Sequence, residues 1–277
     1  MYEFLKGHGT ENDFVVLPDP DGAVHSDLSP ERVRALCDRH AGLGGDGVLR
    51  VIRTAAYSGP DAPQSEAEWF MDYRNADGSV AEMCGNGTRV FAQYLRAQGL
   101  AGDRVTIATR AGDKTLTFDG SCWTVDLGRP RLLGWSEVAV EGRSWKARHV
   151  DMGNPHAVAF LDGGVEELAA LGLDRQPQYD EAVYPHGVNV ELVVSTAPDR
   201  LRMRVHERGV GETRSCGTGI GAVGVAAMEA DGVGGAAGEA TYSVTVPGGT
   251  LTVTWTADDR VLLSGPAAIV AAGQTEL

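Results

Sequence analysis

Short runs in which apolar and polar residues alternate dominate this chain, and they predict a strand-rich fold with few helices. In the first quarter of the sequence, strands are expected over residues 2–6, 13–17, 48–53 and 67–73. A helix is expected over residues 30–40, because Ser29-Pro30-Glu31 supplies a capping residue, a proline at the first helical position and an acid in the first turn. Residues 58–66, rich in Pro, Ser, Gly and acidic residues, are expected to form a surface loop.

The order of predicted elements occurs twice along the chain. In each half a predicted helix, over 88–98 and over 220–229, is followed by a strand, a glycine turn, a Thr-Leu-Thr strand, an acidic turn and a strand that ends near a glycine and a proline. A repeat of this length indicates a duplicated domain and not a solenoid, whose periods are much shorter. We expect one domain over residues 1–127, a second over 128–266, and a final strand within 267–277 that returns to the first domain.

Each of the two predicted helices is preceded by the pattern Cys-Gly-x-Gly, at Cys84 and at Cys216. Glycine makes up 37 of the 277 residues, so two of four cysteines would carry this pattern by chance only about 0.2 % of the time. A cysteine at the start of a helix meets unpaired backbone N–H groups and the positive end of the helix dipole, which favour the thiolate and can hold an anion nearby. Two such cysteines in equivalent places indicate a pair of proton carriers that face each other where the halves meet.

Composition and charge narrow the class of function. Apolar residues make up 43 % and charged residues 22 % of the chain, which is typical of a globular enzyme, and 277 residues suffice for two domains. The formal net charge of −14 argues against nucleic acid and anionic membranes as partners. No apolar run approaches the ~20 residues of a membrane-spanning helix and no signal segment is visible, so we expect a cytoplasmic protein with reduced thiols. The cysteines and histidines lack metal-ligand spacing, and we expect no metal.

Two thiols at helix starts suit the inversion of a carbon by deprotonation. One side chain removes a proton from one face of the carbon while the other delivers a proton to the opposite face, so the substrate need not rotate. Pyridoxal phosphate would need a Schiff-base lysine, and none of Lys6, Lys114 and Lys146 lies in a phosphate-loop context. We therefore expect no cofactor, and the two helix starts would stabilise the charge that grows on the substrate carboxylate.

Further motifs, spread over nearly the whole chain, resemble the diaminopimelate epimerase family. Besides the two cysteine motifs they are Gly9–Phe14, Asn75–Ser79, Met152–His156, Asn189-Val190 and Glu207–Gly209. The resemblance implies an α/β (α+β) fold of two pseudo-symmetric domains, each a β-barrel-like sheet wrapped around a central helix, with the active site in the cleft between them. It also implies a cofactor-independent isomerase, a homodimer, that interconverts LL- and meso-diaminopimelate in lysine and peptidoglycan precursor biosynthesis.

By this resemblance, Cys84 and Cys216 are the catalytic acid/base pair. The reacting carboxylate would be held by backbone groups of Gly85, Asn86, Gly217 and Thr218. Five polar side chains would hold the amino-acid substrate, largely at its non-reacting end, namely Asn12, Asn75, Asn154, Asn189 and Arg208. Glu207 and His156 would orient the substrate and tune the thiols. Gly47 stands where many relatives carry a substrate-contacting glutamine, so no side chain can make that contact here.

Two other functions stay open from the residues alone. The first is a two-thiol racemase or epimerase of another amino acid, of the proline or hydroxyproline type. The number of Asn and Arg groups at motif positions favours a longer substrate with two charged ends. The second is a non-catalytic protein whose two thiols close into a switchable disulfide. Cys37 and Cys122 lack the helix-start motif and are interpreted as packing residues.

Overall fold

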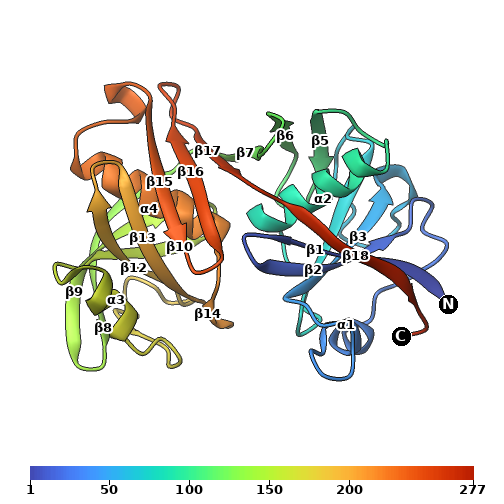
Figure 1. Cartoon of the computed structure of the whole chain (residues 1–277), viewed down its shortest axis with the longest axis horizontal. Coiled ribbons are helices and arrows are strands. Elements are labelled where there is room, and N and C mark those ends of the chain that lie inside the picture. Colours follow the sequence, from blue (N-terminus) through green and yellow to red (C-terminus); the bar gives the residue numbers. More distant parts are fainter. The chain divides into compact units, whose positions relative to one another are not determined.

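The computed structural model describes all residues, 1–277, and the chain divides into two compact units (Figure 1). Unit 1 consists of residues 1–125 and 265–277, and unit 2 consists of residues 126–264. The chain leaves unit 1 within strand β7 (Trp123–Gly128) and returns within strand β17 (Val261–Gly265). No helix in either unit is long and apolar enough to span a membrane.

Most of the secondary-structure elements of unit 1 are strands. They are β1 (Tyr2–Gly9), β2 (Asn12–Pro18), β3 (Gly47–Arg53), β4 (Trp69–Asn75), β5 (Arg104–Ala108), β6 (Lys114–Phe118) and the C-terminal β18 (Ala268–Thr275). Its helices are α1 (Pro30–Cys37), the short 3-10 turn η1 (Thr54–Ala56) and the longer α2 (Gly85–Ala97).

Unit 2 contains the remaining elements. Its strands are β8 (Arg131–Val140), β9 (Arg143–Asp151), β10 (Pro155–Phe160), β11 (Gln178–Tyr179), β12 (Asn189–Ala197), β13 (Arg200–Glu207), β14 (Gly211–Thr213), β15 (Ala240–Val246) and β16 (Gly249–Trp255). Its helices are α3 (Gly164–Ala170), α4 (Gly217–Ala230) and the 3-10 turn η2 (Gly235–Ala237).

The two units share one strand topology. Neighbouring strands run in the order β18-β1-β2-β3-β4-β5-β6-β7 in unit 1 and β8-β9-β10-β12-β13-β15-β16-β17 in unit 2. In both orders the successive pairs are antiparallel, antiparallel, parallel, antiparallel, parallel, antiparallel and antiparallel. The expected duplicated fold of strands and central helices is therefore confirmed.

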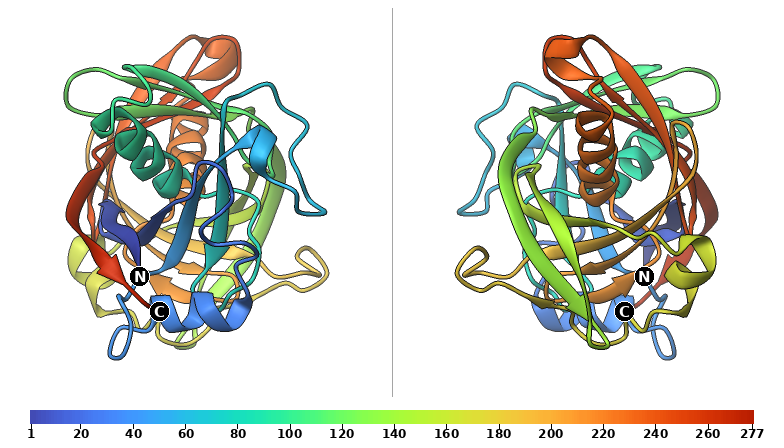
Figure 2. Two further views of the ribbon diagram at one scale, coloured as in Figure 1. Left: turned by 90° about the vertical axis from the view of Figure 1, so that its right-hand side faces the viewer. Right: turned by 90° about the vertical axis from the view of Figure 1, so that its left-hand side faces the viewer.

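The longest helix of each unit lies against its strands, as the two views of Figure 2 show. In unit 1, α2 packs on β1, β2, β3, β4, β6 and β18, and in unit 2, α4 packs on β9, β10, β12, β15 and β16. Residues 220–228 of α4 are all buried, because this helix is apolar on every side. Gly224 lets β16 approach, since a Cβ there would lie 2.6 Å from Val253 Cγ1.

Several predicted boundaries were wrong by a few residues, for local reasons. The first helix ends at Cys37 and not at residue 40, because the Asp38 carboxylate accepts the backbone N–H groups of His40 and Ala41, both at 2.7 Å. The two central helices begin at Gly85 and Gly217, three residues before the predicted starts.

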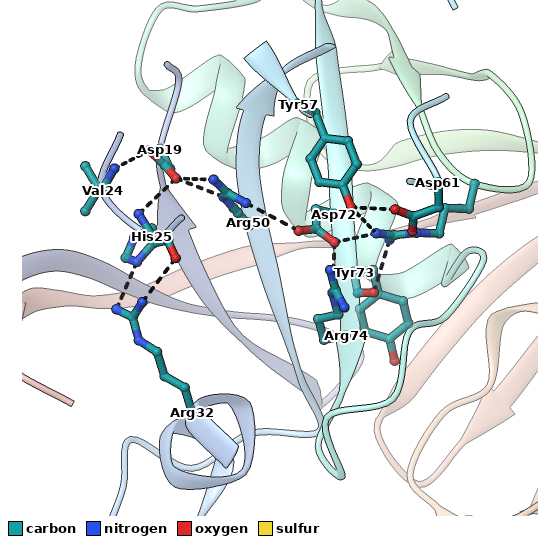
Figure 3. A network of polar contacts seen from close by, with 11 residues as sticks. Asp19, Val24, His25, Arg32, Arg50, Tyr57, Asp61, Asp72, Tyr73 and Arg74 are labelled. Carbon is teal, nitrogen blue, oxygen red and sulfur yellow. Dashed lines mark hydrogen bonds and ion pairs between the residues drawn. The ribbon is translucent and has the colours of Figure 1, made fainter. Parts of the chain in front are cut away.

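A buried network of charged side chains crosses unit 1 (Figure 3). Asp72, on β4, is fully buried, and its Oδ1 accepts from Arg74 Nε at 3.0 Å and from Arg110 Nη2 at 2.7 Å. Arg50, on β3, lies 3.8 Å from Asp72 Oδ2 and pairs with Asp19 at 2.6 Å. The Asp72 carboxylate is therefore shared by three buried guanidinium groups, those of Arg50, Arg74 and Arg110.

Replacing Asp72 by alanine is expected to lower the free energy of unfolding of unit 1 by about 3–5 kcal/mol, because three buried cations would lose their shared carboxylate. Urea unfolding measures the change. Asp103→Ala is the control, since Asp103 pairs with Arg96 at 2.6 Å while 67 % of its side chain stays exposed, and loss of such a pair costs about 1 kcal/mol or less. Equal losses in the two variants would contradict this role of Asp72.

His25, at one end of the same network, is held in its neutral form. The residue is buried, its Nε2 has no hydrogen-bond partner, and its Nδ1 lies 3.0 Å from Arg32 Nη2. A guanidinium can only donate, so Nδ1 must accept. Burial, followed by the charge of Arg32, lowers the pKa of His25 from 6.5 to about 4, although Asp19 acts in the opposite direction.

The neutral state of His25 is expected to make folding weaken as the pH falls from about 6.5 to 4. In the unfolded chain His25 takes up its proton near pH 6.5, but in the folded protein only near pH 4. The stabilisation of the folded state is therefore complete above pH 6.5 and is lost as the pH falls to 4. The loss should be about 3 kcal/mol. His25→Gln, which does not titrate, should flatten this part of a urea-derived stability profile. A slope equal to that of the parent protein would show that His25 does not cause it.

Candidate active site

Cys84 lies at the start of α2 and caps that helix. Its backbone is extended (φ −138°), and its Sγ accepts the backbone N–H of Gly87 at 3.4 Å. The sulfur lies 3.6 Å from Asn12 Oδ1, which also accepts from Asn86 Nδ2 at 3.1 Å. Cys84 therefore lies at a helix start, as expected. Its sulfur contacts Asn12, and Asn12 in turn contacts Asn86; both asparagines are predicted substrate-binding residues.

The turn between β1 and β2 places Asn12. Thr10 and Glu11 both have positive φ, at 52° and 60°, which reverses the chain within two residues. Asn12 is then fixed by Asp46 of the glycine-rich turn, whose Oδ2 accepts from Asn12 Nδ2 at 2.8 Å. The same Asp46 carboxylate also pairs with Arg39 at 2.7 Å. The Gly-rich turn at residues 42–47 thus acts as a support for Asn12.

Arg89, one turn into α2, is a fully buried cation without a carboxylate partner. Its guanidinium donates to Asn86 Oδ1 at 3.0 Å, to Thr10 Oγ1 at 3.3 Å and to the carbonyl oxygen of Gly85 at 3.5 Å. Burial lowers the pKa of Arg89 to about 10, and the negative charge available to Cys84 acts in the opposite direction. Arg89 is therefore a positive charge that interacts with the first cysteine.

Asn75 and Gly47 face each other in the register of β3 and β4. Asn75 Oδ1 accepts from the Tyr73 hydroxyl at 2.8 Å, and its Nδ2 donates to Ser79 Oγ at 3.0 Å. A Cβ at Gly47 would lie 2.5 Å from the carbonyl oxygen of Arg74 and 2.7 Å from the Tyr73 ring. Tyr73 and the β4 backbone occupy the space that a glutamine at position 47 would need.

Cys216 occupies the equivalent place in unit 2, at the start of α4, but it is buried and makes no capping hydrogen bond. Burial raises the pKa of its thiol well above the usual value, and the carboxylates of Glu207 and Glu191 raise it further. The N–H of Gly219 and the hydroxyl of Thr218 act in the opposite direction. The charges nearest to the second cysteine are therefore negative.

A chain of polar contacts leads away from Cys216. The sulfur lies 3.6 Å from Thr218 Oγ1, which is 3.3 Å from Asn154 Nδ2. Asn154 Oδ1 lies 3.0 Å from His156 Nε2, and His156 Nδ1 lies 2.6 Å from Glu191 Oε1. Three of the predicted residues, Asn154, His156 and Thr218, are thus joined to the cysteine.

The other predicted residues of unit 2 lie at the adjoining ends of β12 and β13. Asn189 Oδ1 accepts the backbone N–H of Arg208 at 3.0 Å, and its Nδ2 donates to the Pro155 carbonyl oxygen at 3.0 Å. The exposed Arg208 guanidinium donates to the His186 carbonyl oxygen at 3.3 Å, and Glu207 accepts from the Thr213 hydroxyl. Since His156 and Asn189 are partners in the parallel β10–β12 pair, these ends meet the polar chain of Cys216.

Each unit therefore holds a candidate half-site, which we define as the predicted residues that lie in that unit. Unit 1 contributes Asn12, Asn75, Cys84, Gly85 and Asn86, and unit 2 contributes Asn154, His156, Asn189, Glu207, Arg208, Cys216, Gly217 and Thr218. No three His, Cys, Asp or Glu side chains gather in a way that could hold a metal ion. The Lys6 ammonium group donates hydrogen bonds to the Asp13 carboxylate and to the carbonyl oxygen of Gly44.

Three charged residues in contact with these half-sites were missed by the sequence analysis, namely Asp46, Arg89 and Glu191. A signal existed for two of them. Glu191 lies within the otherwise apolar run Val190–Val194, and Arg89 comes two residues after the first cysteine motif, directly before the apolar run Val90–Ala92. A lone charge in a buried element needs a partner or a function.

The fold and the half-sites define a class, that of duplicated α/β proteins with a cysteine at the start of each central helix. The family model of diaminopimelate epimerase matches residues 4–133 and 148–270. The diaminopimelate epimerases of Streptomyces coelicolor and Rhodococcus jostii are 56 % and 50 % identical to this chain, over 98 % of it and over 94 % and 96 % of their own lengths. The chain belongs to the diaminopimelate epimerase family.

The fold also resembles solved structures of distant sequence. A crystal structure of a phenazine biosynthesis protein of the PhzF family from Bacillus anthracis has a TM-score of 0.70 at 15 % identity, and the match covers 100 % of this chain and 99 % of that one. At this identity the likeness concerns the fold alone.

Gly47→Ala tests the contact of Gly47 with β4. The added Cβ would press on the Arg74 carbonyl oxygen and the Tyr73 ring, so we expect a loss of about 1–3 kcal/mol in the free energy of unfolding. Gly102→Ala is the matched control, because a Cβ there meets no atom within 4 Å, and its effect should be within about 0.5 kcal/mol. Thermal or urea unfolding compares the two variants. An unchanged free energy of unfolding in the Gly47→Ala protein would mean that β4 shifts to make room for the added Cβ.

Proposed function

We propose that this protein is an isomerase that interconverts LL- and meso-diaminopimelate. One cysteine thiolate removes the α-proton and the other cysteine thiol returns a proton to the opposite face. The observation that carries this proposal is the equivalent position of Cys84 and Cys216, each immediately before the central helix of one of two units with the same strand order. Membership of the diaminopimelate epimerase family and the names of the two relatives support the choice of substrate.

The helix starts supply the electrostatic part of the mechanism. Removing an α-proton places negative charge on the substrate carboxylate, and unpaired N–H groups of a first helical turn can donate hydrogen bonds to an anion there. We assign this role to the backbone of Gly85 and Asn86 on α2 and of Gly217 and Thr218 on α4. Because these donors are fixed before the reaction, they need no reorganisation as the charge develops.

The charges around the two sulfurs assign their resting states. Arg89 is a cation that interacts with Cys84, whereas Glu207 is a carboxylate that interacts with Cys216. A cation favours the thiolate and carboxylates favour the thiol. We therefore propose that, without substrate, Cys84 is the base and Cys216 the acid, and that these states exchange with each turnover.

The remaining polar side chains are proposed to hold the substrate, with Asn12 and Asn75 in unit 1 and Asn154, Asn189 and Arg208 in unit 2. Amides both donate and accept, which suits an amino-carboxylate, and the guanidinium of Arg208 suits a second carboxylate. His156 and Glu207 orient substrate and thiols. We further propose that the protein acts in the cytoplasm, where it supplies precursors of lysine and peptidoglycan. We also propose that it is a homodimer, as the family resemblance implies, and sedimentation of the purified protein tests this.

An assay of LL-diaminopimelate in D2O, with no added cofactor, tests the function. The product should carry deuterium at the inverted α-carbon, because the returned proton comes from a thiol that has exchanged with solvent. Cys84→Ala and Cys216→Ala should each lower kcat by about 10³-fold or more, since each removes one of the two proton carriers. Cys122→Ala, which alters a cysteine between β6 and β7 outside both half-sites, should keep the parent activity.

Two outcomes would replace the proposal. Turnover of proline or hydroxyproline without turnover of diaminopimelate would indicate a two-thiol racemase of another amino acid. Full activity in either Cys84→Ala or Cys216→Ala would exclude the two-thiol mechanism.

A further inference from the structure

Glu191 is a charged group that neither the family motifs nor the proposed mechanism use. It lies on β12 within an apolar run, is fully buried, and its Oε2 has no hydrogen-bond partner. Its Oε1 lies against the first turn of α4, since a Cβ at Gly219 would be 2.6 Å from that oxygen. Burial raises the pKa of Glu191, and the contact with His156 opposes this shift. Its one ion-pair partner is therefore His156.

The polar chain from Glu191 to Cys216, which we call the relay, is continuous. It consists of the four contacts already given, at 2.6, 3.0, 3.3 and 3.6 Å, that join Glu191, His156, Asn154, Thr218 and Cys216. Each of its three middle members can both donate and accept, because a histidine, an amide and a hydroxyl all have that property. The relay therefore permits two directions of hydrogen donation.

In the first direction every group donates toward the sulfur. His156 carries two protons, donating from Nδ1 to ionised Glu191 and from Nε2 to Asn154 Oδ1. Asn154 Nδ2 donates to Thr218 Oγ1, and the Thr218 hydroxyl donates to the thiolate of Cys216. This direction stabilises the thiolate, because a hydrogen bond to the charged form favours it.

In the second direction the sulfur is the donor. The Cys216 thiol donates to Thr218 Oγ1, the Thr218 hydroxyl donates to Asn154 Oδ1 after the amide has turned over, and Asn154 Nδ2 donates to the bare Nε2 of His156. Nδ1 still donates to Glu191. The two states differ by one proton, held on Cys216 Sγ in one and on His156 Nε2 in the other, so the net charge of the relay does not change.

We propose that this relay couples the protonation state of Cys216 to that of His156, with Glu191 as the positioning residue that stabilises the doubly protonated ring. The inference deepens the function proposed above, on which its significance rests. A cysteine that must serve as thiol in one direction of reaction and as thiolate in the other gains a hydrogen-bonding partner in both states.

A direct electrostatic interaction between Glu191 and Cys216 would shift the protonation equilibrium of Cys216 in the opposite direction to the relay. An experiment can therefore distinguish the two effects. The charged or titratable groups around it are Glu207 on β13 and Glu191 on β12, which face Cys216, His149 on β9, which faces His156, and Tyr184, which faces Glu191. Through space alone, removing the Glu191 charge would favour the Cys216 thiolate. Through the relay, the same change removes the counter-charge of His156 and disfavours the thiolate.

The experiment measures the rate at which iodoacetamide alkylates Cys216, as a function of pH, in the Cys84→Ala protein and without substrate. Only the thiolate reacts, so the rate reports its population. Glu191→Gln is expected to slow alkylation at neutral pH about tenfold, which corresponds to an upward shift of the midpoint by about one pH unit. Faster alkylation or an unchanged rate would overturn the relay.

A double-mutant cycle separates the relay from any other effect of Glu191. Thr218→Val removes the last link at nearly constant volume, and in that background Glu191→Gln should no longer slow the alkylation of Cys216. The same tenfold change in both backgrounds would overturn the proposal. Thr218→Ser keeps the hydroxyl and should preserve the coupling.

A comparison of Thr218→Val with Thr218→Ser also tests the relay if the Glu191→Gln protein does not fold. Thr218→Val alone should slow alkylation of Cys216 and Thr218→Ser should not, and equal rates in the two would overturn the relay. Because these measurements need no turnover, they stand apart from the assay of the proposed function. A protein inactive on diaminopimelate that shows the coupling would refute the function alone, and an active protein without the coupling would refute the relay alone.

Discussion

Every α-helix begins with backbone N–H groups that have no partner within the helix, and the rest of this structure depends on how that constraint is met. Both long helices, α2 and α4, lie against the strands of their units, so their first turns cannot all be satisfied by bulk water. A cysteine precedes each helix in extended conformation, and small residues follow it. The positive end of a helix is thereby left facing a sulfur atom, which is the physical basis of the chemistry proposed for this protein.

Duplication repeats this arrangement without making the two copies identical. The strand order and directions agree in the two units, yet a cation interacts with the first sulfur and a carboxylate with the second. Arg89 lies in the first helix, and Glu207 lies on β13, beside the second. An acid/base pair that begins each turnover in unequal states needs such a difference, because identical surroundings would give the two thiols equal populations of thiolate.

The central helices and the repeat could be predicted from sequence because their signals are local. The Cys-Gly-x-Gly pattern, the apolar spacing after it and the turn residues between strands all lie within a few positions of the elements that they define. Helix ends were predicted less well, as at Asp38, since a single side chain that accepts two backbone N–H groups decides where the turn closes. The family resemblance supplied the candidate site residues, yet it did not show which neighbours hold them in place.

The sequence by itself determined the duplicated α/β fold, the position of each cysteine at a helix start and the family to which the chain belongs. Only the tertiary structure decided the contacts between Glu191 and His156, between Asp46 and Asn12, and between Tyr73 and the space beside Gly47. The first two of these join residues 35 and 34 positions apart. Such pairs arise when the registers of parallel strands such as β10–β12 and β2–β3 bring distant side chains to one end of a sheet. Strand register is a property of the packed core, so the polar partners of a site follow from it and not from their spacing in the chain.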